Sequence, residues 1–206
     1  MNIVKHGMNS IASVSTEASG AQWVKRFTGS RSTTDLANPF RGRVEAFIGA
    51  IRAAGATVVI NGTLRDPRRA YLMHWSWRIT RAHADPQSIP SMNGVHINWS
   101  HLDRSGNYSR VASMAGAFDM VKAFGMDRLG VAPSLTSRHI VGSAIDMSVG
   151  WQGNLLIVDS HGHPVEIKTP PWSGMNLQLH RVGESYGVIK YNRRGRDEPH
   201  WSDNGT

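Results

Sequence analysis

The sequence lacks cysteine, and this absence excludes both disulfide bonds and a zinc site built on thiolate ligands. It also has no apolar run close to the roughly 20 residues that a transmembrane helix needs, so we expect no membrane span. Residues 1–20 contain no apolar segment of the kind that a secretory signal requires. We therefore expect a protein that is made in the cytoplasm without a signal for the general secretory (Sec) route.

Acidic residues are scarce relative to basic ones. The chain has 15 Asp and Glu residues against 23 Lys and Arg residues, which gives a formal net charge of +8. A basic protein is attracted to polyanions, but the local basic clusters carry no recognisable nucleic-acid-binding motif. The clusters are Arg65, Arg68, Arg69 and Lys190, Arg193, Arg194, Arg196. We expect no specific nucleic-acid partner.

The hydrophobic pattern predicts helices and strands in a mixed order. Apolar residues recur at helical spacing in four segments: 39–54, 67–79, 114–121 and 175–186. Short apolar or alternating runs predict strands at 57–60, 143–149, 155–158, 165–167, 188–191 and 200–202. These elements predict a single-domain α+β fold, in which helices flank a small antiparallel sheet.

The amino-terminal region differs in composition from the rest of the chain. Residues 1–36 are rich in Ser, Thr, Ala and Gly and show only a weak hydrophobic pattern. We predict that residues 1–36 form a partly ordered arm and that residues 37–206 form the folded domain.

Two segments far apart in the sequence supply residues that can bind a metal ion. The run from Ser137 to Asp146 contains His139 and Asp146, and the segment from Asp197 to Trp201 contains His200. Three protein ligands with a vacant fourth position are typical of a catalytic zinc site. His139, Asp146 and His200 are therefore candidate ligands of Zn²⁺, and the carboxylate beside His200 could transfer protons.

The strand predicted at 143–149 determines the face on which the Asp146 side chain lies. Side chains alternate along a strand, so Asp146 shares one face with Ala144 and Ser148. Ile145 and its apolar neighbours lie on the opposite face, which we expect to be buried. Asp146 should therefore point into a cleft.

The two segments resemble the motifs of the LAS-type zinc peptidases, peptidase family M15. The first matches Ser-x-His-x-x-Gly-x-Ala-x-Asp, and the second matches an acidic residue three positions before a His-aromatic pair. The matching residues are Ser137, His139, Gly142, Ala144 and Asp146, then Asp197, His200 and Trp201. The second segment is closest to the L-alanyl-D-glutamate endopeptidases of the phage-endolysin type. The resemblance covers roughly residues 56–203.

The resemblance implies a role for each of these residues. His139, Asp146 and His200 would be the zinc ligands, and Asp197 would be the general base. The geometry of a regular strand instead places Glu198 on the same face as His200, because residues two apart share a face. Asp197 and Glu198 therefore both remain candidates for the general base, and the resemblance favours Asp197.

Two further residues gain roles from the resemblance. Ser137 would support the first ligand by hydrogen bonding, and Arg65 would hold a carboxylate or carbonyl of the substrate. The family often has a glutamine five residues after this arginine, and this chain has Ala70 there. The substrate contact that this glutamine would make beside the arginine is therefore not implied for this chain.

The function that the resemblance implies is zinc-dependent peptidoglycan hydrolysis. The target would be a stem-peptide bond, L-Ala–D-Glu or a nearby D,L bond. A D-Ala-D-Ala carboxypeptidase and a non-catalytic cell-wall-binding module are the alternatives. Such an enzyme would reach the periplasm or cell wall through a phage holin or a dedicated secretion system, and an exported antibacterial effector would also imply an immunity protein.

The histidines at 161 and 163 have a different interpretation. Gly162 and Pro164 mark a turn between the predicted strands 155–158 and 165–167. We therefore predict that His161 and His163 lie at a hairpin tip and are not metal ligands.

Overall fold

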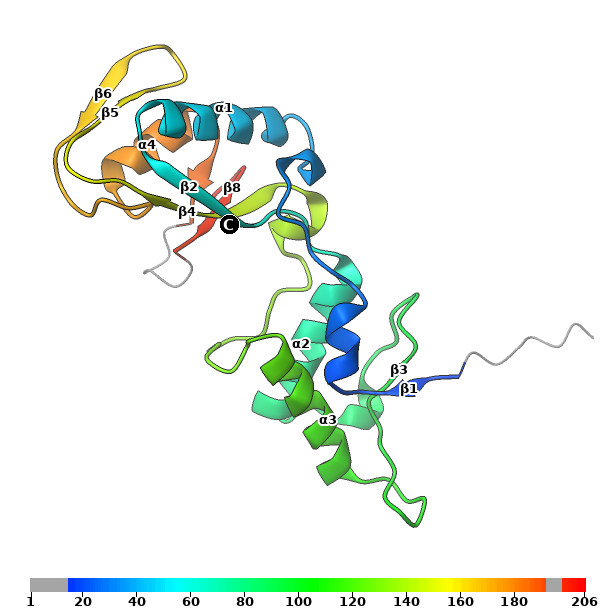
Figure 1. Cartoon of the computed structure of the whole chain (residues 1–206). Helices are drawn as coiled ribbons and strands as arrows, with labels where there is room; N and C mark the ends of the chain where they lie inside the picture. Colours follow the sequence, from blue (N-terminus) through cyan, green and yellow to red (C-terminus); the bar gives the residue numbers. More distant parts are fainter. Residues whose placement is uncertain (1–14, 192–197) are drawn as a thin grey trace, which may run out of the picture. The chain divides into compact units, whose positions relative to one another are not determined.

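The structure is a computed structural model that describes residues 15–191 and 198–206 (Figure 1). It has an α+β fold whose main sheet is antiparallel. The chain divides into two compact units. One contains the described residues up to Trp23 together with Trp75–Ala132, and the other contains Val24–His74 together with Pro133–Thr206. No helix in the described ranges has both the length and the apolar character needed to span a membrane.

The larger unit is built on a four-stranded antiparallel sheet. Its strand order is β2-β4-β8-β7, in which β4 and β8 are the central strands. The strands are β2 (Thr57–Gly62), β4 (Ala144–Gly150), β8 (His200–Ser202) and β7 (Ile189–Lys190). Strand β4 alternates as predicted, because Ile145, Met147 and Val149 are buried while Ser148 is exposed.

Two helices cover the buried face of this sheet. The helices α1 (Phe40–Ala53) and α4 (Leu177–Ser185) contribute apolar side chains to one core cluster, which also contains Ile145 and Trp201 (Figure 1). Trp201 is fully buried, and its ring centroid lies 5.5 Å from that of Phe47. The helical spacing read from Phe40 to Ile51 therefore identified the core face of α1.

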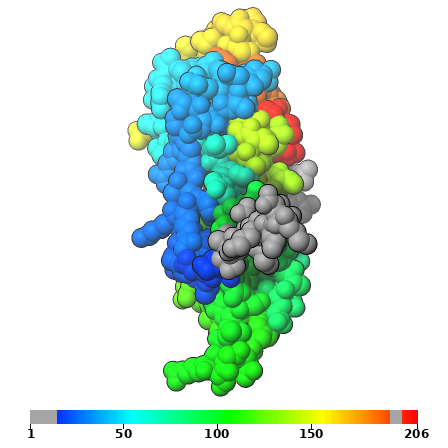
Figure 2. Space-filling view, turned by 90° about the vertical axis from the view of Figure 1, so that its right-hand side faces the viewer, coloured from blue at the N-terminus to red at the C-terminus, as the bar shows by residue number. Residues whose placement is uncertain are grey.

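The hairpin β5 (Leu155–Val158) and β6 (Pro164–Ile167) belongs to the same unit. It forms the yellow surface in Figure 2. Asp159 accepts backbone hydrogen bonds from His161 and His163, each at 2.9 Å, and both histidines are exposed. The predicted hairpin tip is confirmed.

The smaller unit contains α3 (Arg110–Ala123), the short helix η3 (Pro86–Ser88) and the parallel pair β1 (Glu17–Ala18) and β3 (Ile97–Asn98). Helix α2 (Pro67–Arg81) passes from one unit to the other, because the division falls between His74 and Trp75. The remaining short helices are η1 (Ala21–Lys25), η2 (Thr33–Asp35) and η4 (Arg138–Val141).

Residues 15–36, the described part of the predicted arm, belong to both units: Glu17–Ala18 pairs with β3, and Leu36 lies in the core of the larger unit. Residue Ser30 is held by backbone hydrogen bonds to Thr63 and Leu64. Backbone pairing of this kind needs no hydrophobic period, which explains why the composition of residues 1–36 did not reveal it.

Two glycines in helices test the packing of the sheet against its helices. A Cβ atom on Gly183 of α4 would lie 2.8 Å from both the Trp201 ring and the Val188 carbonyl oxygen, whereas nothing lies within 4 Å of one on Gly49 of α1. We expect Gly183→Ala to destabilise the protein by about 1–3 kcal/mol, because the core must shift. Gly49→Ala should stabilise it by about 0.5–1 kcal/mol, because alanine favours the helix.

Denaturant unfolding of the two variants measures both effects. A neutral or stabilising Gly183→Ala would contradict the close packing of α4 on β8. The Gly49→Ala variant controls for the intrinsic helix propensity of alanine, which both substitutions share.

Candidate metal centre

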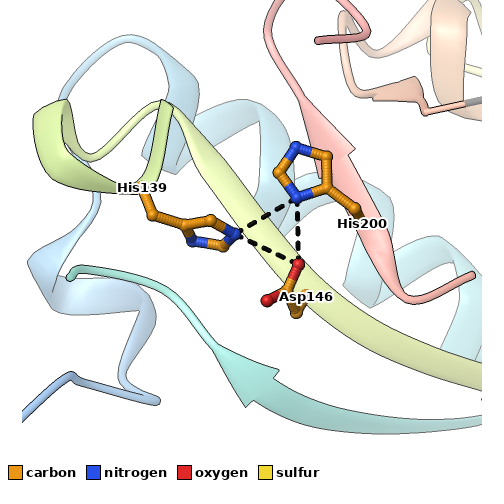
Figure 3. A group of neighbouring side chains, drawn as sticks. All are labelled: His139, Asp146 and His200. Atoms are coloured by element: carbon orange, nitrogen blue, oxygen red, sulfur yellow. Dashed lines mark hydrogen bonds and ion pairs between the residues drawn. The ribbon is translucent and has the colours of Figure 1, made fainter. Parts of the chain in front are cut away.

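Three side chains meet above the central strands of the larger unit. His139 comes from η4, Asp146 from β4 and His200 from β8 (Figure 3). The Nε2 atom of His139 lies 3.1 Å from Oδ1 of Asp146 and 3.2 Å from Nδ1 of His200. The third side of this triangle, from His200 Nδ1 to Asp146 Oδ1, is 3.0 Å. The structure thus brings together the three predicted ligands, and this group could hold a metal ion.

Strand pairing positions two of the three ligands. Asp146 and His200 are direct partners in the antiparallel register of β4 and β8, and directly opposed residues project from the same face. The backbone N–H of Met147 donates to the Pro199 carbonyl at 2.8 Å and extends this pairing by one residue. The two ligands therefore meet because of the sheet.

A tight turn positions the third ligand. Ser137 caps η4, because its hydroxyl accepts a hydrogen bond from the His139 backbone N–H at 3.4 Å. Gly142 ends η4 with φ of 68°, and a Cβ atom there would lie 2.8 Å from the Ala37 backbone nitrogen. Ser137 therefore supports the backbone that carries His139, and Gly142 is the residue that the return into β4 requires.

Backbone carbonyls determine which nitrogen of each histidine ring carries the proton. His139 Nδ1 lies 2.6 Å from the Thr63 carbonyl oxygen, and His200 Nε2 lies 3.2 Å from that of Thr206. A carbonyl oxygen only accepts, so these ring nitrogens carry the hydrogens. When the imidazoles are neutral, His139 Nε2 and His200 Nδ1 direct lone pairs towards the carboxylate of Asp146. Three electron-rich atoms this close together are stabilised by a cation between them.

The dimensions of the triangle fit a tetrahedral metal ion. Metal–ligand bonds of about 2.0–2.1 Å at tetrahedral angles place neighbouring ligand atoms roughly 3.3–3.4 Å apart. The measured separations of 3.0–3.2 Å are slightly smaller, so the side chains need to move apart by only a few tenths of an ångström. Two imidazole nitrogens and one carboxylate oxygen form a donor set for transition metals.

The charge state of Asp146 suits a metal ligand. Burial alone would raise the pKa of the Asp146 carboxyl. Without a metal, protonated rings of His139 and His200 donate hydrogen bonds to this carboxyl, and these bonds and the charge of the rings outweigh burial. The net effect holds the pKa of Asp146 well below its usual range. Asp146 is therefore a carboxylate at neutral pH, which is the form that coordinates a metal.

A second layer of contacts holds the strand that carries His200. Lys190 is buried, and its Nζ donates to the carbonyl oxygens of Glu198 at 2.5 Å and His200 at 3.1 Å. The Thr206 backbone N–H donates to Ser202 Oγ at 3.0 Å, which positions the carbonyl that meets the His200 ring. Sequence reasoning missed these supports, because contacts to backbone carbonyls leave no residue signature.

The structure describes only one of the two candidates for the general base. Asp197 lies outside the described residues, so its role stays a prediction. Glu198 is exposed and lies in a turn with Pro199, and β8 begins only at His200. The regular strand that would place Glu198 on the face of His200 is therefore absent at this point, and that argument for Glu198 does not hold.

A pocket of about 230 Å³ opens beside the ligands. Its lining includes His139, Asp146 and the predicted substrate-binding residue Arg65, whose backbone N–H donates to the His139 carbonyl at 3.0 Å. Ala70, at the position where the family often has glutamine, is fully buried and is absent from the pocket lining. Arg65 is thus close to the metal centre, whereas position 70 lies in the interior.

The pocket wall is positively charged. Arg69 also lines it, and its Nη1 donates to the carbonyl oxygens of Val24 at 2.9 Å and Phe27 at 3.1 Å. Burial, and next the charge of Arg65, lower the pKa of Arg69. The guanidinium of Arg65 has no hydrogen bond or ion pair with any residue that the structure describes. A negatively charged group in the pocket would satisfy it.

Comparisons with known proteins do not assign the chain to a family. No protein-family model matches it, and no curated protein matches it. Within the described residues, His139, Asp146 and His200 are the group with metal-binding geometry, and His161 and His163 belong to no such group. The candidate metal centre is therefore supported by the three side chains and their contacts alone.

Removing one ligand should abolish tight metal binding. We expect the wild-type protein to bind one divalent transition metal and His200→Ala to bind it at least about 100-fold more weakly, because one of three protein ligands is lost. His163→Ala, which removes an exposed histidine, should bind like the wild type. Isothermal titration with a zinc salt measures all three. Equal affinities in the two variants would contradict the assigned ligands.

Proposed function

We propose that this chain is a zinc-dependent peptidoglycan hydrolase that cleaves a stem-peptide bond, L-Ala–D-Glu or a nearby D,L bond. The observation that carries the proposal is the triangle of His139, Asp146 and His200, whose distal ring nitrogens are tied to backbone carbonyls. Three protein ligands leave a coordination position for water or substrate, as in catalytic rather than structural zinc sites.

The choice of substrate is supported by the resemblance to the M15 peptidases. All five fixed positions of the first motif are present, and its histidine and aspartate meet the histidine of the second motif at one point. The positive wall of the pocket supports an acidic peptide as ligand, because stem peptides carry free carboxylates. Reaching such a substrate requires a holin or a secretion system, and an effector would imply an immunity protein.

The proposed mechanism assigns a task to each residue. A bound zinc ion supplies Lewis acidity, which makes a water molecule nucleophilic near neutral pH and stabilises negative charge on a carbonyl oxygen. His139, Asp146 and His200 would hold the ion, and Arg65 would orient the substrate beside it. Asp197 takes a proton from the attacking water and returns it to the leaving amine as the peptide C–N bond breaks.

A D-Ala-D-Ala carboxypeptidase is a second candidate. Arg65 lines the pocket, and its guanidinium has no ion-pair partner among the described residues, so it could bind the terminal carboxylate of such a substrate. The two candidates use the same metal centre and differ in the bond that they cleave.

Digestion of purified peptidoglycan, with fragments identified by mass spectrometry, tests the proposal. We expect zinc-loaded protein to release fragments with a new amino-terminal D-Glu, and we expect a chelator to stop the release. Asp146→Asn should lose at least about 1,000-fold in activity, because the ligand charge that holds the metal is removed. His161→Ala, at the exposed hairpin, should keep full activity.

Other results of this experiment would change or reject the proposed activity. Release of D-Ala alone would transfer the assignment to the carboxypeptidase. Chelator-insensitive release, or no release by zinc-loaded protein, would reject metal-dependent hydrolysis of peptidoglycan.

A further inference from the structure

The pocket wall includes a segment from the predicted amino-terminal arm. Gly29, Ser30 and Arg31 line the same pocket as His139 and Asp146. Ser30 donates its backbone N–H to the Leu64 carbonyl and accepts from the Thr63 N–H, both at 2.8 Å. This segment therefore lies against the chain that leads from β2 to Arg65.

The backbone around Arg31 is held on both sides. Before it, the two hydrogen bonds of Ser30 fix the chain against Thr63 and Leu64. After it, the Ser32 N–H donates to Ser30 Oγ at 2.9 Å, and Ser32 caps the short helix η2. The position of Arg31 at the pocket wall is thus set by ordered contacts.

The charges of the pocket are unbalanced. Arg31, Arg65 and Arg69 line it, and Asp146 is its only acidic residue among those that the structure describes. Asp146 is occupied by His139 and His200. The guanidinium of Arg31, which is exposed, has no hydrogen bond or ion pair with any described residue. Arg31 and Arg65 are therefore two arginines of the pocket wall whose guanidinium groups have no hydrogen bond or ion pair with a described residue.

We propose that Arg31 is a specificity-determining residue that binds a carboxylate of the peptide substrate. The inference rests on the proposed function and adds a residue from outside the region that resembles the M15 peptidases. In an L-Ala–D-Glu bond followed by a γ-linked residue, the free acid next to the cleaved bond is the α-carboxylate of D-Glu. A guanidinium binds a carboxylate through two parallel hydrogen bonds, and an amide at the same place loses the charge and one acceptor.

Two synthetic stem peptides, L-Ala–γ-D-Glu–L-Lys with a free D-Glu α-carboxylate and its α-amide, test this role. We expect the wild type to prefer the carboxylate peptide in kcat/KM by at least about tenfold. Arg31→Ala should reduce this preference by about tenfold, mainly through a higher KM, because the contact exists before and during the reaction. Arg31→Lys should keep part of the preference, because it keeps the charge without the paired hydrogen bonds.

Arg52→Ala is the matched control. Arg52 is an exposed arginine in α1 and does not line the pocket, so its removal changes the net charge equally. This variant should keep the wild-type preference. Equal zinc content and equal circular dichroism spectra of the variants establish that each is folded.

The outcomes separate the inference from the function on which it rests. A wild type that cleaves both peptides equally, or an Arg31→Ala variant that keeps the preference, would overturn the role of Arg31 and leave the hydrolase intact. A zinc-loaded wild type that cleaves neither peptide would reject the proposed function, and the role of Arg31 with it.

Discussion

The register between β4 and β8 is the constraint on which the rest of the structure depends. It pairs Asp146 with His200 on one face and Ile145 with Trp201 on the other. Ile145 and Trp201 are both fully buried in the core. A shift of one residue would turn every side chain of the strand to the opposite face, so that Asp146 would enter the core. The hydrophobic core and the metal centre are therefore fixed by the same pairing.

The geometry of the candidate metal centre is set by backbone contacts as much as by its side chains. The carbonyls of Thr63 and Thr206 hold the outer nitrogens of the two histidine rings and direct the inner nitrogens to Asp146. Such outer contacts orient the ligands before a metal binds and raise their basicity. Lys190 adds to this preparation, because its buried ammonium group holds the carbonyls on both sides of Pro199. These contacts keep the lone pairs of the two neutral rings directed at the Asp146 carboxylate. A cation between the three groups would remove their mutual repulsion.

Much of the fold followed from periodicity. The spacing of Phe40, Val44 and Ile51 predicted α1, and the alternation from Ile145 to Val149 predicted the buried face of β4. The motif residues His139, Asp146 and His200 were also identified as a group, although Asp146 and His200 are 54 residues apart. The predictions of α1 and β4 succeeded because each depends on side-chain type and local spacing, whereas the grouping of the three ligands rested on two motifs that are distant in the sequence.

Features that depend on backbone contacts were not predictable. Nothing in the sequence shows that Ser30 pairs with Thr63, or that the chain divides within the uninterrupted helix α2. The strand argument for Glu198 failed because Glu198 and Pro199 form a turn before β8 begins. Proline fixes its own φ and restricts its neighbour, but both conditions are met by a turn as well as by a strand.

The most direct measurement is anomalous X-ray diffraction from crystals grown with zinc, recorded on either side of the zinc absorption edge. We expect one strong peak bonded to His139 Nε2, His200 Nδ1 and a carboxylate oxygen of Asp146, with bonds of about 2.0–2.2 Å. This peak should disappear in crystals of His200→Ala. A peak bound by other residues, such as His161 and His163, or no peak at this centre, would contradict the assignment of His139, Asp146 and His200 as metal ligands.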